Sequence, residues 1–166
     1  MMELWDLLDE MRNKTGYTHL RGTPLSAGEY HLVVHVWILN DAGEFLISKR
    51  TPNKTYPGMW ECTGGSAVAG DDSLTTALKE SREELGIILL PENGTLFTTY
   101  KAGPNFIDVW IFKQNVDLDT ITFQPDETCD AQHATPQAVK QMMQNGTFFP
   151  NYKYPYLDDF FAKYCK

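Results

Sequence analysis

The segment from Gly64 to Ile87 constrains this chain more than any other, because two adjacent glycines lead into a helix carrying three closely spaced glutamates. Glu80, Glu83 and Glu84 stand at positions i, i+3 and i+4, so a helix places their side chains on one face. Like charges at this spacing repel, at roughly a few tenths of a kcal/mol per pair on an isolated helix. Such a cluster is either a solvated acidic face or a site for a hard cation.

Local signals define the helix, which is predicted over residues 72–85. Asp72 or Ser73 can cap its first turn, and Gly86 ends it. Small and apolar side chains at helical spacing predict an inner face made of Leu74, Ala77, Leu78, Ser81 and Leu85. The three glutamates are expected on the opposite, outer face. Ser81 is expected to donate a hydrogen bond to a backbone carbonyl one turn back.

Carboxylate oxygens suit Mg²⁺ or Mn²⁺, and Mg²⁺ usually keeps several waters while it bridges to substrate phosphates. Gly64 and Gly65 are predicted to form a turn ahead of the helix. A backbone without side chains can approach a metal ion or a phosphate closely there. This context favours a metal and phosphate site over a solvated acidic face.

The spacing across the segment matches a longer pattern. Gly65 is followed by five residues, Asp71 and seven more residues, and then by Lys79-Glu80-Ser81-Arg82-Glu83-Glu84-Leu85-Gly86-Ile87. This closely resembles the Nudix box, which reads Gly, five residues, Glu, seven residues, Arg-Glu-apolar-X-Glu-Glu-X-Gly-apolar. Asp71, Lys79 and Ser81 depart from that pattern, and the three glutamates are intact.

The resemblance implies an α+β fold of the Nudix type, an α/β/α sandwich around a mixed β-sheet. It implies hydrolysis of a diphosphate linked to another group X, in a nucleoside diphosphate derivative or a similar compound. The implied cofactor is Mg²⁺ (or Mn²⁺). Its implied ligands are the backbone carbonyl of Gly64 and the carboxylates of Glu80, Glu83 and Glu84.

The resemblance leaves the catalytic base open among those glutamates and a loop carboxylate. Glu127 is the loop candidate, because it follows the predicted strands and precedes a predicted helix, although an acidic loop would also expose such a residue to solvent. The candidate substrate-binding residues are Arg50, Gly65 and Lys79. Basic residues that flank the predicted site strands could contact phosphate or serve solubility, and they are Lys49, Arg50, Lys54 and Lys101.

The rest of the chain is predicted to alternate strands with two further helices. The predicted elements are a β-hairpin within 3–21, a loop at 22–29, strands at 30–39, 44–49, 59–63, 95–101, 106–114 and 129–134, and helices at 136–144 and 156–165. The first segment, 3–11, could also be a short helix. A chain of 166 residues suits one domain, with residues 1–29 as an N-terminal hairpin and loop extension.

The composition of the chain limits the kinds of partner it is expected to bind. The formal net charge is −8, so binding to nucleic acid through bulk charge is not expected. The three cysteines are far apart and form no CxxC pair, which disfavours a disulfide framework or a zinc site. No signal peptide or membrane-spanning run is visible. We expect a cytoplasmic protein, monomer or homodimer, acting on a small-molecule diphosphate.

A competing resemblance is to isopentenyl-diphosphate isomerases, which share this fold. They resemble the chain around Thr18-His19, His31, Pro57-Gly58-Met59-Trp60 and Glu83-Glu84. Those enzymes use a catalytic cysteine followed by Gly-His, whereas Cys62 is followed here by Thr-Gly-Gly-Ser. The hydrolase interpretation is therefore favoured. Isomerase-like activity and a non-catalytic nucleotide-binding module remain the alternatives.

Overall fold

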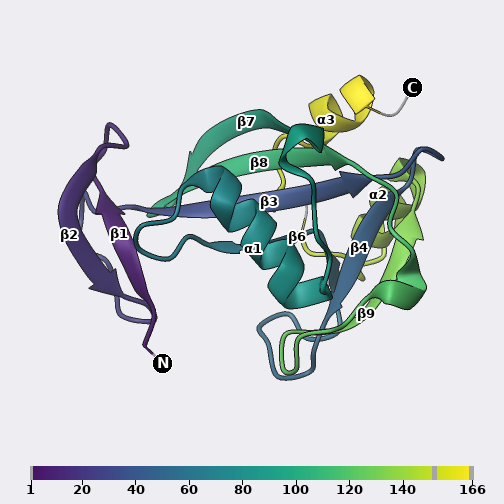
Figure 1. Cartoon of the computed structure of the whole chain (residues 1–166), viewed down its shortest axis with the longest axis horizontal. Coiled ribbons are helices and arrows are strands. Elements are labelled where there is room, and N and C mark those ends of the chain that lie inside the picture. The colour runs from purple at the N-terminus through teal and green to yellow at the C-terminus, as the bar shows by residue number, and fades with distance from the viewer. Residues whose placement is uncertain (1, 151–152, 165–166) are drawn as a thin grey trace.

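A mixed seven-stranded sheet forms the centre of the computed structural model, which describes residues 2–150 and 153–164 (Figure 1). Five strands run in the order β5-β4-β3-β8-β7, while β6 pairs with β3 and β9 pairs with β4. The strands of this sheet are β3 (His31–Leu39), β4 (Phe45–Arg50), β5 (Trp60–Glu61), β6 (Thr63–Ser66), β7 (Gly94–Ala102), β8 (Asn105–Lys113) and β9 (Thr128–Ala134). Only β3 and β8 pair in parallel among the described strands.

Helices cover both faces of the sheet. They are α1 (Ser73–Leu85), α2 (Pro136–Gln144) and α3 (Leu157–Tyr164), with two short 3-10 helices, η1 (Pro91–Asn93) and η2 (Leu118–Thr120). Alternate residues of β3 enter two separate cores, as expected for a strand buried on both faces. Val34 and Val36 pack in the core that contains Ala77 of α1, whereas Trp37 packs with Phe160 of α3. The predicted α/β/α sandwich is confirmed.

Most predicted elements are found close to their expected bounds. The helix predicted at 136–144 is α2, and the last helix is α3, although Cys165 lies outside the described residues. The two 3-10 helices were not predicted, because each is a single turn without helical periodicity. No helix within the described ranges is long and apolar enough to cross a membrane.

The predicted glycine turn is wrong in one respect. Gly64 and Gly65 lie in strand β6, paired with His35 and Val34 of β3, and neither has a positive φ. Glycine is required at these two positions because there is no room for a Cβ atom. A Cβ on Gly64 would clash with the carbonyl oxygen of Val34, and one on Gly65 would clash with the carboxylate of Glu80. The close approach inferred from the sequence is therefore made by a strand.

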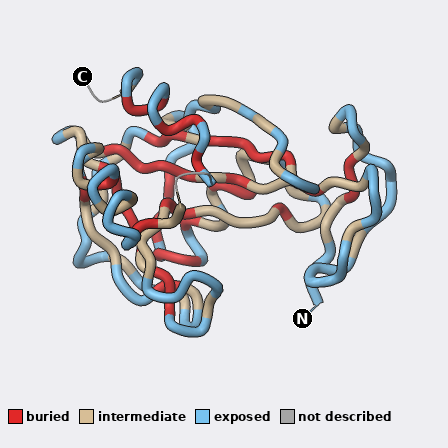
Figure 2. Tube along the Cα trace, turned by 180° about the vertical axis from the view of Figure 1, so that it is seen from behind, coloured by how far each residue is buried: buried red, intermediate tan, exposed pale blue. Residues whose placement is uncertain are grey.

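The N-terminal residues form the expected hairpin, a separate two-stranded sheet of β1 (Leu4–Leu8) and β2 (Lys14–Leu20). Figure 2 shows this hairpin as largely exposed, at the end of the molecule away from the buried sheet. An isolated two-stranded hairpin is marginally stable, so its tethers matter. Ala69 N–H donates to the Leu4 carbonyl at 2.7 Å, and the Trp5 ring stacks on His31 at 3.7 Å between centroids.

Candidate active site

A cavity of about 150 Å³ lies where α1, β6 and the N-terminal hairpin meet. Its lining residues are Glu3, Arg21, Lys54, Gly64, Gly65, Glu80, Glu83, Glu84, Gln124 and Glu127. The structure thus brings together seven of the residues proposed from sequence, including the loop carboxylate Glu127 and Lys54. Arg50 and Lys79, also proposed for substrate binding, do not line this cavity.

Helix α1 sets the glutamates at three different depths. Glu84 is buried, Glu80 is half-buried and Glu83 is exposed. The expectation that all three lie opposite the packed face is wrong, because α1 turns this side toward β6, whose glycines leave room for the carboxylates. Local details of the helix are as predicted. Asp72 accepts from Thr75 N at 2.7 Å, and Gly86 ends the helix at φ 68°.

Ser81, one of the departures from the box, finds the predicted partner. Its hydroxyl donates to the Ala77 carbonyl at 3.0 Å, one turn back in α1, and its side chain is fully buried. The other two departures pair with each other, since Lys79 Nζ lies 2.6 Å from Asp71 Oδ2. This pair of an exposed lysine and a half-buried aspartate joins α1 to the loop before it. Lys79 is therefore placed to hold that loop and not to face the cavity.

Burial and mutual repulsion define the electrostatics of the glutamate cluster. Burial and the neighbouring Glu83 raise the pKa of Glu80 to about 7. Burial, with Glu61 and Glu80 nearby, raises the pKa of Glu84 well above its ordinary value. Low-dielectric surroundings and like charges both disfavour the ionised form, and a bound cation reverses both effects. The cluster therefore has the charge and the oxygen donors that a hard divalent cation prefers.

The cavity fits a metal ion through the chemistry of its oxygen donors. Within residues 2–150 and 153–164, no group of three or more His, Cys, Asp or Glu side chains lies at coordination geometry. Glu80, Glu83 and Glu84 neighbour one another on one helix and repel when ionised, and a bound cation would offset that repulsion. Their oxygen chemistry suits Mg²⁺ or Mn²⁺, and Gly64 lies on the same cavity wall.

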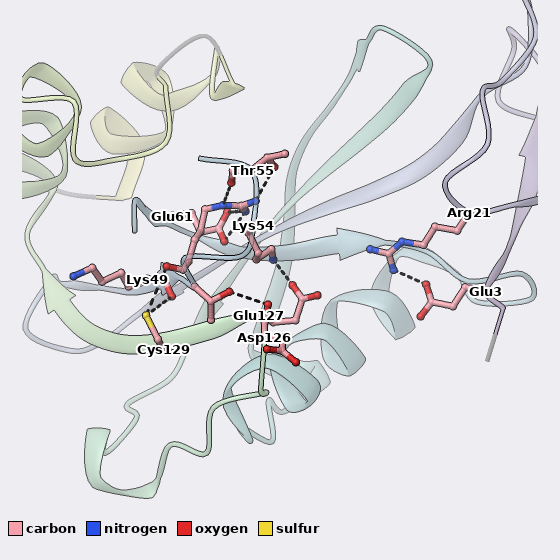
Figure 3. Close-up of polar contacts among 11 residues, drawn as sticks. Glu3, Arg21, Lys49, Lys54, Thr55, Glu61, Asp126, Glu127 and Cys129 are labelled. Atoms are coloured by element: carbon pink, nitrogen blue, oxygen red, sulfur yellow. Dashed lines mark hydrogen bonds and ion pairs between the residues drawn. The ribbon is translucent and has the colours of Figure 1, made fainter. Parts of the chain in front are cut away.

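Two cations reach the cavity from different elements (Figure 3). Lys54 forms an ion pair with Glu127, and Arg21, just after β2, forms one with Glu3. In Figure 3 the Arg21 guanidinium extends from the hairpin toward Lys54 and Glu127. Five carboxylates and two cationic side chains line the cavity, so its formal charge is −3. A polyanionic substrate therefore needs a bound cation there, as the net charge of the chain suggests.

Glu127 is held near α1 by the chain around it. Gln124 N–H donates to the Glu84 carbonyl at 3.0 Å, and Thr51 N–H donates to the Glu127 carbonyl at 3.2 Å. These bonds join the end of α1, the loop before β9 and the loop that carries Lys54. Sequence reasoning found Glu127 and Lys54 as candidates. It missed Glu3 and Arg21, because nothing local indicates that the hairpin folds back over the glutamates.

Arg50 has a different place from the one proposed. Its Nη1 donates to both carboxylate oxygens of Glu61 at 3.0 and 2.7 Å, and its Nε donates to the Thr55 carbonyl at 2.7 Å. Arg50 is buried, so these partners satisfy a charge that would be costly if left unpaired. Burial raises the pKa of Glu61, whose charge also reaches Glu84. Glu61 is thus a further acidic residue beside the cluster, which sequence reasoning missed.

A second, larger cavity of about 500 Å³ adjoins the first. The two share Gly64 and Gly65 in their walls. Most of the larger wall is apolar, with Val33, Ile107 and Phe149 among its residues. A diphosphate placed against the glutamates can therefore extend its other group past the edge of β6 into this space.

Comparison with known proteins identifies related sequences and folds. The family model described as the NUDIX domain matches residues 29–155. Proteins described as uncharacterized Nudix hydrolases from Listeria monocytogenes and Listeria innocua are 39% and 38% identical over 151 residues, covering 90% of this chain and 89% of each relative. A crystal structure from Deinococcus radiodurans matches 99% of this chain and 100% of its own, with a TM-score of 0.75 at 19% identity.

Proposed function

The chain belongs to the Nudix hydrolase family and is an enzyme that acts on pyrophosphate bonds, and from this premise we propose that it hydrolyses a nucleoside diphosphate derivative with Mg²⁺ or Mn²⁺. Family membership favours a catalytic role over a non-catalytic binding module. The observation that carries the proposal is the cavity in which Gly65 abuts Glu80, with Glu83, Glu84 and Glu127 around it.

The acidic residues of α1 and of the loop before β9 have separate roles in this proposal. Glu80, Glu83 and Glu84 would hold the metal together with the Gly64 carbonyl. A bound Mg²⁺ or Mn²⁺ supplies charge neutralisation on the diphosphate and on the leaving oxygen. Glu127 is the proposed base that takes a proton from the attacking water, because it reaches the cavity from a loop without belonging to the helix cluster.

The two cationic side chains complete the proposed phosphate site. Lys54 and Arg21 are each paired with a carboxylate, so they are positioned and charged before substrate arrives. Phosphate oxygens compete well for such partners, because charge-assisted hydrogen bonds are the stronger ones. Group X of the substrate occupies the larger cavity beyond β6.

Activity is expected to depend on a divalent cation. We propose a screen of nucleotides, nucleotide sugars, dinucleotides and prenyl diphosphates with Mg²⁺ or Mn²⁺, measuring phosphomonoester release. Addition of EDTA is expected to lower the rate at least about 100-fold, because the metal supplies several kcal/mol of charge stabilisation. Excess Mg²⁺ is expected to restore it. Undiminished turnover in EDTA, or no turnover on any diphosphate, would contradict the proposal.

Cys62 is not expected to take part. Burial raises the pKa of its thiol, and Sγ lies 3.8 Å from the hydroxyl oxygen of Tyr154. A reactive cysteine needs an accessible thiolate, so Cys62→Ala is expected to keep kcat/KM within about threefold of wild type in the hydrolase assay. An isomerase mechanism requires this thiol. Isomerisation of isopentenyl diphosphate by wild type that is lost in Cys62→Ala would revive that alternative.

A further inference from the structure

His35 occupies a position where it can contact the group attached to the diphosphate. It lies on β3 directly beside Gly64 of β6, one of the two glycines shared by the cavities. Its side chain points to the face of the sheet away from α1, among Tyr154 and Tyr156, and lines the larger cavity. The residue as a whole is half-buried. A group that extends past the edge of β6 into the larger cavity therefore lies near this ring.

A buried relay fixes the proton on the His35 ring. The Trp37 indole N–H donates to the Tyr156 hydroxyl at 2.9 Å, and the same oxygen lies 2.8 Å from His35 Nδ1. Indole nitrogen can only donate, so the phenol accepts from Trp37. Tyr156 is buried, and leaving its own proton without an acceptor would cost free energy. The phenol therefore donates to Nδ1, which makes Nε2 the nitrogen that carries the ring proton.

The same contacts disfavour a charged ring. A proton on Nδ1 would place the Tyr156 hydroxyl between two donors and leave its own proton without an acceptor. A neutral ring with Nδ1 already bonded offers one polar group to a ligand, an uncharged N–H. Cys62 and Tyr154 of this wall contact each other. The other polar residues of the wall are Glu61, Tyr100, Asn105 and Lys153. Around them the wall is largely apolar.

We propose that His35 is a specificity-determining residue that donates its Nε2–H to a hydrogen-bond acceptor on group X. This rests on the proposed function and refines it, since it selects substrates whose X bears a carbonyl or ring-nitrogen acceptor, as a nucleobase does, over those with a purely hydrocarbon X. The selection follows because a substrate that fills the cavity displaces water from the ring, and a donor then left without an acceptor is costly. The relay through Tyr156 prevents the ring from switching to an acceptor at that position.

The test compares two X groups on three variants. Uridine diphosphate carries acceptors on its base, whereas isopentenyl diphosphate has only a hydrocarbon as X. His35→Leu is expected to raise KM for uridine diphosphate about tenfold or more, with kcat nearly unchanged and no comparable change for isopentenyl diphosphate. His35→Gln keeps an amide donor and is expected to recover most of that affinity. Equal melting temperatures would confirm that the variants are folded.

Tyr156→Phe tests the relay itself. It removes the donor to Nδ1, so the ring can exchange its proton between nitrogens and KM for uridine diphosphate is expected to rise. A long-range ¹H–¹⁵N spectrum of wild type is expected to show His35 with its proton on Nε2, and this resonance is expected to move with uridine diphosphate but not with isopentenyl diphosphate. That spectrum needs no turnover.

Three outcomes would overturn the inference. They are a proton on Nδ1 in wild type, an unchanged KM ratio between the two substrates in His35→Leu, and a wild-type preference for isopentenyl diphosphate. Failure of the proposed function looks different, because wild type would then hydrolyse no diphosphate in Mg²⁺ or Mn²⁺. The spectrum would still report whether His35 meets the base of uridine diphosphate.

Discussion

Replacing Glu84 with glutamine is expected to lower kcat by about 100- to 1,000-fold, the scale of losing one preorganised charge-stabilising group. Glutamine keeps the shape of the side chain but removes the negative charge that would hold a cation. Glu84 is buried on α1 and lies near both Glu61 and Glu80, so water cannot easily substitute for it. Glu83→Gln is expected to give a loss of similar size. Steady-state kinetics in saturating Mg²⁺ measures both.

The matched control is Glu92→Gln, which removes an exposed carboxylate of η1 outside the cavity. It is expected to leave kcat unchanged. The variant Glu84→Gln must also be shown to be folded, and the structure makes a prediction about its thermal stability. Without metal, its melting temperature is expected to equal or exceed that of wild type at pH 8, because a buried and crowded carboxylate no longer has to ionise.

The pH dependence of this stability has a definite sign. The pKa of Glu84 is raised in the folded state above its ordinary value of 4.5, so the folded protein binds more protons than the unfolded chain at pH values above 4.5. Metal-free wild type should therefore lose stability as pH rises from 5 to 8. The loss should be smaller in Glu84→Gln. Full activity in Glu84→Gln would exclude the assigned role, and loss of folding would move the test to Glu83→Gln.

Loss of the ion pair between Arg12 and Asp108 is expected to lower the stability of the fold substantially. Asp108 is 1% exposed in the middle of β8, and Arg12, in the turn of the N-terminal hairpin, donates to both of its carboxylate oxygens, Nη1 to Oδ1 at 2.7 Å. Arg12→Met keeps the apolar stem but leaves the carboxylate buried without its charge partner. Breaking a fully buried pair costs roughly 3–5 kcal/mol.

The expected cost here is lower, about 2–3 kcal/mol, because the Arg12 side chain is 33% exposed and water can reach the pair. For a chain of this size that is about 5–10 °C in melting temperature. The hairpin also carries Arg21 and Glu3 to the cavity, so KM is expected to rise more than kcat falls. Thermal unfolding and steady-state kinetics of the same preparation measure both effects.

Two comparisons separate this interpretation from general damage to the hairpin. Lys14→Met removes another ion pair of the hairpin, to Asp6, but both partners are more exposed, so it is expected to cost less than about 1 kcal/mol. Adding Asp108→Asn to Arg12→Met removes the stranded charge and is expected to recover part of the lost stability. Equal losses from Arg12→Met and Lys14→Met would count against a special role for the buried carboxylate.

Local chemistry in the sequence was sufficient to predict the elements and the reaction class. Cap residues and helical spacing located α1, since Asp72, Ser81 and Gly86 act through bonds within one or two turns. Alternation and β-branched residues located β3 and β8. The fixed spacing from Gly65 to Glu84 identified the family. These features share a short range in the chain, which is why a sequence can display them without its fold.

Long-range packing decided what the sequence could not display. Whether Glu84 is solvated or buried depends on β6 passing beside α1. Arg50 was assigned to substrate because it flanks a predicted site strand, and its bonds to Glu61 on a separate strand were not visible in the sequence. Arg21 reaches the cavity only because a hairpin folds back from the N-terminus. The glycines and glutamates of residues 64–87 therefore determined the kind of chemistry. The tertiary structure decided how deeply each carboxylate is buried, which cations reach the cavity and which donor lines the larger cavity. Burial and charge pairing arise between segments far apart in the chain, so the sequence alone does not display them.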